Sequence, residues 1–196
     1  MTRDKTTSVL IFDFFGVICS EIAPFWLARY FPPDQAAEIK RDLVTLADTG
    51  EISQDELFLR LGQMSGHAAV VVAEEWMQHV SIDQAMLKLL DDCRQSFRVG
   101  LLTNSPAPFV RQILARYDLV RRFESILVSS EVALAKPDRR IYLLMLERMQ
   151  AAPLQSLMID DNARNIEGAV AAGMKGYHFQ SESGLREELQ RLHDDA

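Results

Sequence analysis

Five short runs of apolar residues, separated by longer stretches with helical spacing, constrain the fold of this chain more than any other feature. The runs lie at residues 8–13, 98–104, 125–130, 156–161 and 175–179. Each is short, apolar and bounded by polar residues or glycine, as buried strands are. Most of the stretches between them have the apolar periodicity of helices. Strands that alternate with helices are typical of a parallel sheet covered by helices on both faces, and we predict that α/β arrangement.

The stretch between the first and second runs breaks the alternation. Its apolar residues recur at helical spacing, and none of its segments has the character of a strand. Prolines 32 and 33 and several glycines divide it into short pieces. We therefore predict an all-helical insertion at residues 20–86, within an α/β core formed by residues 1–19 and 87–196.

Charge and cysteine content narrow the classes of partner. The net charge of −7 opposes broad binding to nucleic acid or to anionic membranes, so an anionic substrate needs a local cation. The two cysteines, Cys19 and Cys93, form no CxxC pair and predict no disulfide framework. The N-terminus does not resemble a signal peptide, and no apolar run approaches a membrane span. We expect a cytoplasmic protein with no nucleic-acid or membrane partner, and the oligomeric state stays open.

Polar residues gather where the predicted strands end. The first strand ends at Asp13, the second at Thr103 and Asn104, and the fourth at Asp160 and Asp161. The carboxyl ends of parallel strands share one edge of the sheet, where ligands bind. Lys136 is expected in a loop at the same edge. Three carboxylates so close together need more positive charge than one lysine supplies, and Mg²⁺ is the cation that suits oxygen ligands best.

Four segments in order resemble the motifs of the haloacid dehalogenase-like hydrolase superfamily. They are IFDFFGVI (11–18), GLLTNS (100–105), LAKPDRRIY (134–142) and MIDDNARNIEGAVAAGM (158–174). The insertion, with its TGEISQDELFLRL segment, resembles the helical cap of one branch of that superfamily. The resemblance covers nearly the whole chain. It implies a Rossmann-like three-layer α/β/α parallel sheet with an inserted α-helical cap, and hydrolase activity.

The resemblance also implies a role for each matching residue. Asp13 is the expected nucleophile, which forms an aspartyl-phosphate during hydrolysis of a small phosphorylated metabolite. Thr103 and Lys136 are expected to hold the charge on the phosphoryl oxygens. The expected Mg²⁺ ligands are Asp13, the Phe15 carbonyl, Asp161 and, through water, Asp160. The backbone N–H groups of Gly16 and Val17 are expected to contact the substrate. Asn104 is expected to orient the substrate, and Asn165 to order the loop.

Phe15 departs from the family pattern. Most phosphatases of this superfamily have an aspartate there, which protonates the leaving group and then activates water, and phenylalanine can do neither. Three interpretations follow: a phosphatase that uses good leaving groups or a proton donor from elsewhere, such as the cap; a metal-independent 2-haloacid dehalogenase; or a protein that binds a phosphorylated ligand without turnover. The acidic pair Asp160–Asp161 favours the first, because without a cation it repels a carboxylate substrate.

Overall fold

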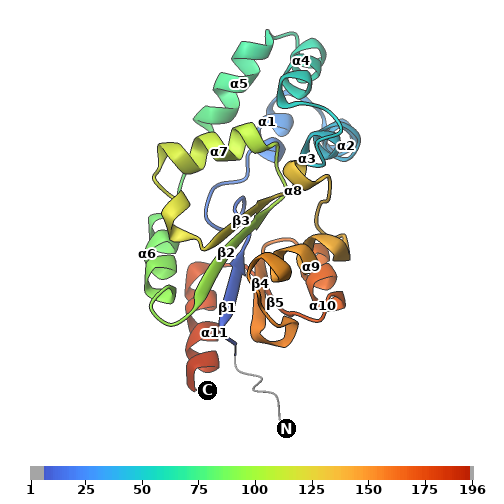
Figure 1. Cartoon of the computed structure of the whole chain (residues 1–196). Coiled ribbons are helices and arrows are strands. Elements are labelled where there is room, and N and C mark those ends of the chain that lie inside the picture. The colour runs from blue at the N-terminus through green and yellow to red at the C-terminus, as the bar shows by residue number, and fades with distance from the viewer. Residues whose placement is uncertain (1–6, 195–196) are drawn as a thin grey trace.

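The computed structural model describes residues 7–194, and its centre is a five-stranded parallel sheet (Figure 1). The strand order is β3-β2-β1-β4-β5, and all four pairings are parallel. The strands are β1 (Val9–Phe12), β2 (Arg98–Thr103), β3 (Ser125–Val128), β4 (Ser156–Asp160) and β5 (Lys175–His178). The predicted α/β class and parallel sheet are confirmed.

Strand β1 is central and buried on both faces. Its side chains alternate between two clusters: Leu10 and Phe12 pack in one, Val9 and Ile11 in the other. Helices α6 (Gln84–Cys93), α7 (Ala107–Arg116) and α11 (Glu182–Asp194) cover the first face. Helices α9 (Arg139–Arg148) and α10 (Ala163–Ala171) cover the second (Figure 1). Burial on both faces explains why the strand reads as a continuous apolar run.

The register of the sheet brings the ends of the central strands together. Phe12 pairs with Leu101 of β2 and with Ile159 of β4. The residues that follow, including Asp13, Thr103 and Asp160, therefore emerge side by side at the carboxyl edge. Short helical turns complete the core: α8 (Ser129–Val132), η2 (Val120–Arg122) and η3 (Pro153–Gln155).

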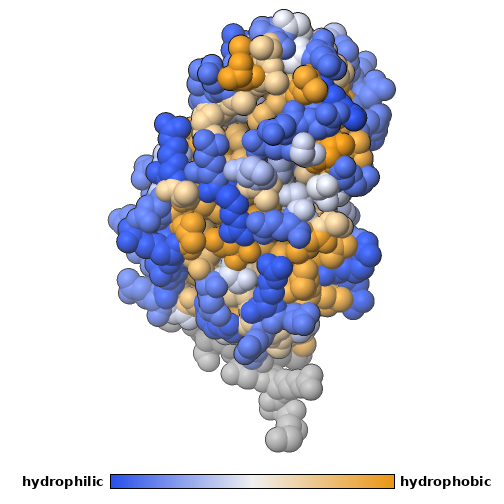
Figure 2. Space-filling view, turned by 45° about the horizontal axis from the view of Figure 1, so that its top comes forward, coloured by the Kyte–Doolittle hydropathy of each residue, from blue (hydrophilic) through white to orange (hydrophobic). Residues whose placement is uncertain are grey.

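The chain between β1 and β2 is helical up to α6, as predicted. It forms α1 (Ala23–Tyr30), α2 (Pro33–Ile39), the π-helix η1 (Lys40–Val44), α3 (Thr45–Asp48), α4 (Gln54–Ser65) and α5 (Ala69–Gln78). We call this insertion the cap. It lies beyond the carboxyl edge of the sheet (Figure 1). In space-filling view its surface is mostly hydrophilic with scattered apolar side chains (Figure 2).

Aromatic packing joins the cap to the core. The ring of Trp76 on α5 lies 5.7 Å, centroid to centroid, from that of Phe109 on α7. The expected division at residues 86 and 87 falls inside α6, whose Asp92 pairs with Arg186 of α11 at 3.6 Å. The division into core and cap remains a prediction, and residues 1–6 and 195–196 of the expected core lie outside the described residues.

Among the described helices, none is both long and apolar enough to cross a bilayer. The expected cytoplasmic location remains a prediction.

Candidate active site

Asp13 follows β1 directly and is buried at the carboxyl edge of the sheet. Its backbone N–H donates to the Ile159 carbonyl at 2.8 Å, which continues the pairing with β4 by one residue. Its Oδ1 accepts a hydrogen bond from the backbone N–H of Phe14 at 2.7 Å. The carboxylate is therefore held in one orientation by the chain that follows it.

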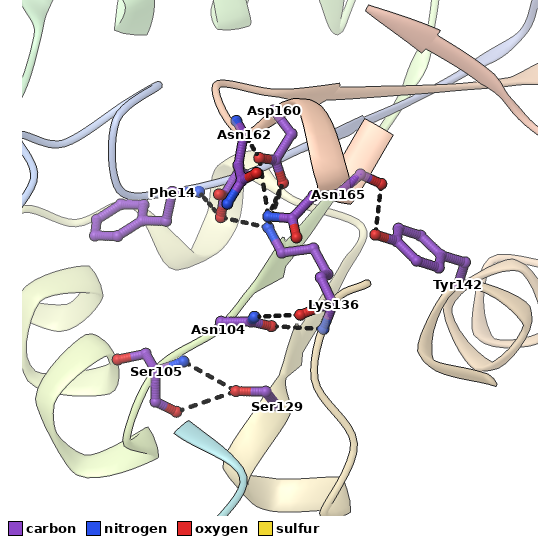
Figure 3. A network of polar contacts seen from close by, with 10 residues as sticks. Phe14, Asn104, Ser105, Ser129, Lys136, Tyr142, Asp160, Asn162 and Asn165 are labelled. Carbon is purple, nitrogen blue, oxygen red and sulfur yellow. Dashed lines mark hydrogen bonds and ion pairs between the residues drawn. The ribbon is translucent and has the colours of Figure 1, made fainter. Parts of the chain in front are cut away.

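Lys136 joins two of the acids. Its Nζ lies 2.8 Å from Asp13 Oδ1 and 2.6 Å from Asp160 Oδ2, and its side chain is fully buried. The loop that carries it is held by Asn104, whose amide donates to the Lys136 carbonyl and accepts from the Lys136 N–H, both at 2.9 Å (Figure 3). Both ends of the Asn104 amide are thus engaged with the main chain, and its expected role in substrate orientation remains a prediction.

Asp160 is fully buried and its carboxylate is well satisfied. Besides Lys136, it accepts from the Asn162 N–H at 2.8 Å and from the Asn165 amide at 3.0 and 3.1 Å (Figure 3). The hydroxyl of Tyr142 donates to the Asn165 carbonyl at 2.6 Å. Asn165 thus helps to hold the Asp160 carboxylate, and its expected role in loop ordering remains a prediction.

Asp161 is only partly buried and approaches the backbone of the first loop. A Cβ atom on Gly16 would lie 2.2 Å from Asp161 Oδ2, and Gly16 has φ +80°. Glycine is therefore required there both for conformation and for space. Carboxylate oxygens of Asp13, Asp160 and Asp161 all lie within 4.8 Å of one another. The carbonyl of Phe15 accepts no hydrogen bond from residues 7–194, so it is available as a further oxygen ligand.

The two backbone N–H groups that are expected to contact the substrate differ in their partners within the protein. The N–H of Gly16 donates to the Cys19 carbonyl at 2.7 Å, whereas that of Val17 donates to no described residue. Of these two expected substrate contacts, only Val17 keeps its N–H unpaired within the described chain. The Thr103 hydroxyl is buried and also has no partner in that part of the chain, which is the state expected of a group that awaits a ligand.

Comparison with known proteins identifies the arrangement. The family model for haloacid dehalogenase-like hydrolases matches residues 7–173. The chain belongs to the haloacid dehalogenase-like hydrolase family. This confirms the resemblance and makes the protein a hydrolase.

Individual members of the family show different degrees of similarity. A sesquiterpene phosphatase of Aspergillus oryzae is 27% identical over 149 residues, which cover 74% of this chain and 76% of that protein. The phosphoglycolate phosphatase of Escherichia coli is 39% identical over 75 residues, but this chain spans only 30% of its length. A HAD-family enzyme of Bacteroides thetaiotaomicron, solved with magnesium and inorganic phosphate, superposes with a TM-score of 0.74 at 21% identity over 89% of this chain and 94% of that one.

The hydrolase has a cavity of about 350 Å³ above these acids, between core and cap. Asp13, Phe15, Lys136 and Asp161 line it from the core. Glu21, Lys40, Asp48 and Trp76 line it from the chain between β1 and β2. The sequence did not single out Glu21, Lys40 or Asp48, because helical periodicity does not reveal which polar residues of a cap face the sheet.

Burial and charge act in opposite directions on the titratable groups of the hydrolase. Burial raises the pKa of Asp13, and Lys136 partly offsets this effect. Burial alone would favour a neutral Lys136, but Asp13 and Asp160 raise its pKa above the ordinary lysine value. The lysine is therefore a permanent cation at neutral pH. Burial also raises the pKa of Asp48 to about 7, so this carboxyl is partly protonated near neutrality.

Proposed function

We propose that this hydrolase is a magnesium-dependent phosphomonoesterase, which acts on a small phosphorylated metabolite through an aspartyl-phosphate at Asp13. One observation carries the proposal: Asp13, Asp160 and Asp161 converge within 4.8 Å around a single buried lysine. Three carboxylates and one ammonium leave an excess of negative charge, which a divalent cation would balance.

The donor set fits Mg²⁺. All the groups offered are hard oxygen atoms, and Gly16 leaves room for Asp161 to approach the loop. Asp13, Asp161 and the Phe15 carbonyl would hold the ion. Asp160, already occupied by Lys136 and two neighbours, would act through water. When bound, the ion supplies positive charge that lets the phosphoryl group approach the acidic site.

The protein's own residues account for the remaining work. Asp13 attacks phosphorus, and the bond to the leaving oxygen breaks as the aspartyl-phosphate forms. Lys136 opposes protonation of Asp13 and orients it, and its charge draws the phosphoryl oxygens. The Thr103 hydroxyl and the Val17 N–H, which have no partner within residues 7–194, are the proposed donors to those oxygens.

The relatives support a phosphorylated substrate but do not identify it. Two are named phosphatases, and the Bacteroides enzyme was solved with magnesium and phosphate. The substrates in those names belong to those proteins, the more so because this chain spans less than a third of the phosphoglycolate phosphatase.

A dehalogenase would use the same Asp13 without metal, and Phe15 is compatible with it. The observation against it is again the acidic pair: an unneutralised Asp161 beside Asp13 repels a haloacid carboxylate. A protein that binds a phosphorylated ligand without turnover is the third candidate.

Three assays separate these functions. Phosphate release from an activated aryl phosphate is measured with and without Mg²⁺, and halide release from 2-chloropropionate is measured without metal. The proposal predicts Mg²⁺-dependent phosphate and no halide. Metal-independent halide release would replace it with the dehalogenase. If neither assay shows turnover and the protein binds inorganic phosphate saturably, the result would support a protein that binds a phosphorylated ligand without turnover.

A further inference from the structure

We propose that Asp48, at the end of cap helix α3, is the acid–base catalyst that replaces the side chain missing at Phe15. The inference rests on the proposed phosphatase function. It answers a specific difficulty, because loss of a positioned acid–base group costs ~10²–10⁴ in rate, and a substitute is needed for ordinary alkyl phosphates.

The first support is position. Asp48 lines the same cavity as Asp13, Phe15 and Lys136, and it reaches that cavity from the cap. A leaving group must point away from Asp13, because attack on phosphorus is in line. A donor that lines the cavity from the cap, and not from the core that carries Asp13, suits the side where the leaving oxygen departs.

The second support is anchoring. The Ser129 hydroxyl at the start of α8 donates to the backbone carbonyl of Asp48, so the end of α3 is tied to the core. Gly50 follows with φ +78°, and a Cβ there would lie 2.6 Å from the Ser130 carbonyl. The cap thus meets the core tightly at this corner, and the main chain of Asp48 is fixed relative to the sheet.

The third support is that the Asp48 carboxyl is uncommitted. It forms no hydrogen bond and no ion pair within residues 7–194, although many other acids of the chain are paired. Burial raises its pKa to about 7; Lys40 and Lys136 oppose that rise, and Glu21 adds to it. Such a group holds a proton near neutral pH and can also release it.

The proton balance closes over two steps. As Asp13 bonds to phosphorus, the bond to the leaving oxygen breaks and protonated Asp48 gives its proton to that oxygen, releasing an alcohol. The Asp48 carboxylate then takes a proton from water as that water attacks the aspartyl-phosphate. Inorganic phosphate leaves, Asp13 is regenerated and Asp48 is protonated again.

Glu21 is the competing candidate. It lines the same cavity, and burial raises its pKa as well. Asp160 and Asp161 contribute to that shift, so the state of Glu21 depends on the acids that would hold the cation. Those two acids are not among the groups that shift the pKa of Asp48, and the Ser129 hydroxyl ties the main chain of Asp48 to the core. We therefore assign the role to Asp48.

The test compares Asp48→Asn, Glu21→Gln and the wild type on an aryl phosphate and on a primary alkyl phosphate, over a range of pH. Asp55→Asn, an exposed acid at the start of cap helix α4, is the matched control. We expect Asp48→Asn to lower kcat/KM about 10²-fold on the alkyl phosphate and little on the aryl phosphate. We also expect it to abolish the alkaline fall in rate near pH 7.

Each other result counts against Asp48. An equal loss on both substrates would indicate a merely structural role, and an unchanged pH profile would exclude proton transfer by this residue. Loss of the alkaline limb in Glu21→Gln alone would move the role to Glu21. In these cases wild-type release of phosphate from the aryl substrate leaves the proposed function standing, whereas its absence would overturn that function and the inference with it.

Discussion

The Nζ atom of Lys136 lies 2.8 Å from Oδ1 of Asp13, and neither side chain is more than a tenth exposed. The same ammonium lies 2.6 Å from Asp160, so a single cation holds two buried carboxylates at the carboxyl edge of the sheet. Removing one partner of such an arrangement leaves uncompensated charge in a medium that solvates it poorly. The site and the stability of the core are therefore coupled.

We expect Lys136→Met to abolish measurable phosphate release and to lower the free energy of unfolding by about 3 kcal/mol at neutral pH. The cause is the pair of buried carboxylates left without a counter-charge. Lys88→Met, which replaces an exposed lysine of α6, is the control and should retain activity and stability. Chemical denaturation and an aryl phosphatase assay provide the two measurements. Wild-type stability in the Lys136 variant would contradict the claim that Lys136 stabilises the two buried carboxylates.

Gly16→Ala and Gly66→Ala form a matched pair. Both glycines have positive φ, so each alanine should cost about 1–2 kcal/mol of stability. Only the Cβ at Gly16 collides with Asp161, because nothing lies within 4 Å of a Cβ at Gly66. We predict that Gly16→Ala alone loses the increase in melting temperature on addition of Mg²⁺. Equal Mg²⁺ responses in the two variants would show that Asp161 does not hold the ion.

Phe15→Asp should raise activity mainly on poor leaving groups such as primary alkyl phosphates. The new carboxyl would supply the acid that the phenylalanine lacks, with a gain of at least about tenfold. Phe15 stacks near Phe109, with ring centroids 6.2 Å apart, so any variant here also loses packing. Phe15→Asn controls for that loss and should show no gain. The ratio of kcat/KM for alkyl and aryl phosphates is the readout, and an unchanged ratio would refute this account of the position.

The shifted pKa of Asp48 predicts a pH dependence of stability. Between the ordinary aspartate value of 3.8 and about 7, the folded state binds more protons at this residue than the unfolded state. Its contribution to stability is therefore greatest at acidic pH and declines as the pH rises through this window. Asp48→Asn removes that contribution. The melting temperature of the variant should rise relative to that of the wild type between pH 4 and about 7. Above that pH the difference between the two melting temperatures should stay constant. A constant difference in melting temperature across the whole pH range would mean that the pKa of Asp48 is not shifted.

The carboxyl edge of the sheet was predictable from sequence because strand ends and chemistry coincide there. Asp13, Lys136 and the pair Asp160–Asp161 all follow or flank short apolar runs, and parallel pairing alone brings them together. The all-helical character of the cap was also predictable, from its periodicity.

The contribution of the cap to the site was not predictable. Lys40 and Asp48 line the cavity, and Asp48 is held there because the Ser129 hydroxyl binds the end of α3. This contact joins distant segments, and no local pattern specifies it. Hydrogen-bond partners could not be predicted either. The sequence did not reveal that the Asn104 amide binds the main chain of Lys136.

The aspartyl-phosphate at Asp13 can be sought directly as a covalent intermediate. Wild-type protein and Asp13→Asn are mixed with an aryl phosphate and Mg²⁺, quenched in acid and analysed by peptide mass spectrometry. We predict a phosphoryl group on the peptide that contains Asp13 in the wild type, and neither phosphoryl group nor phosphate release in the variant, which should remain folded. Phosphate release by Asp13→Asn at the wild-type rate would contradict this prediction.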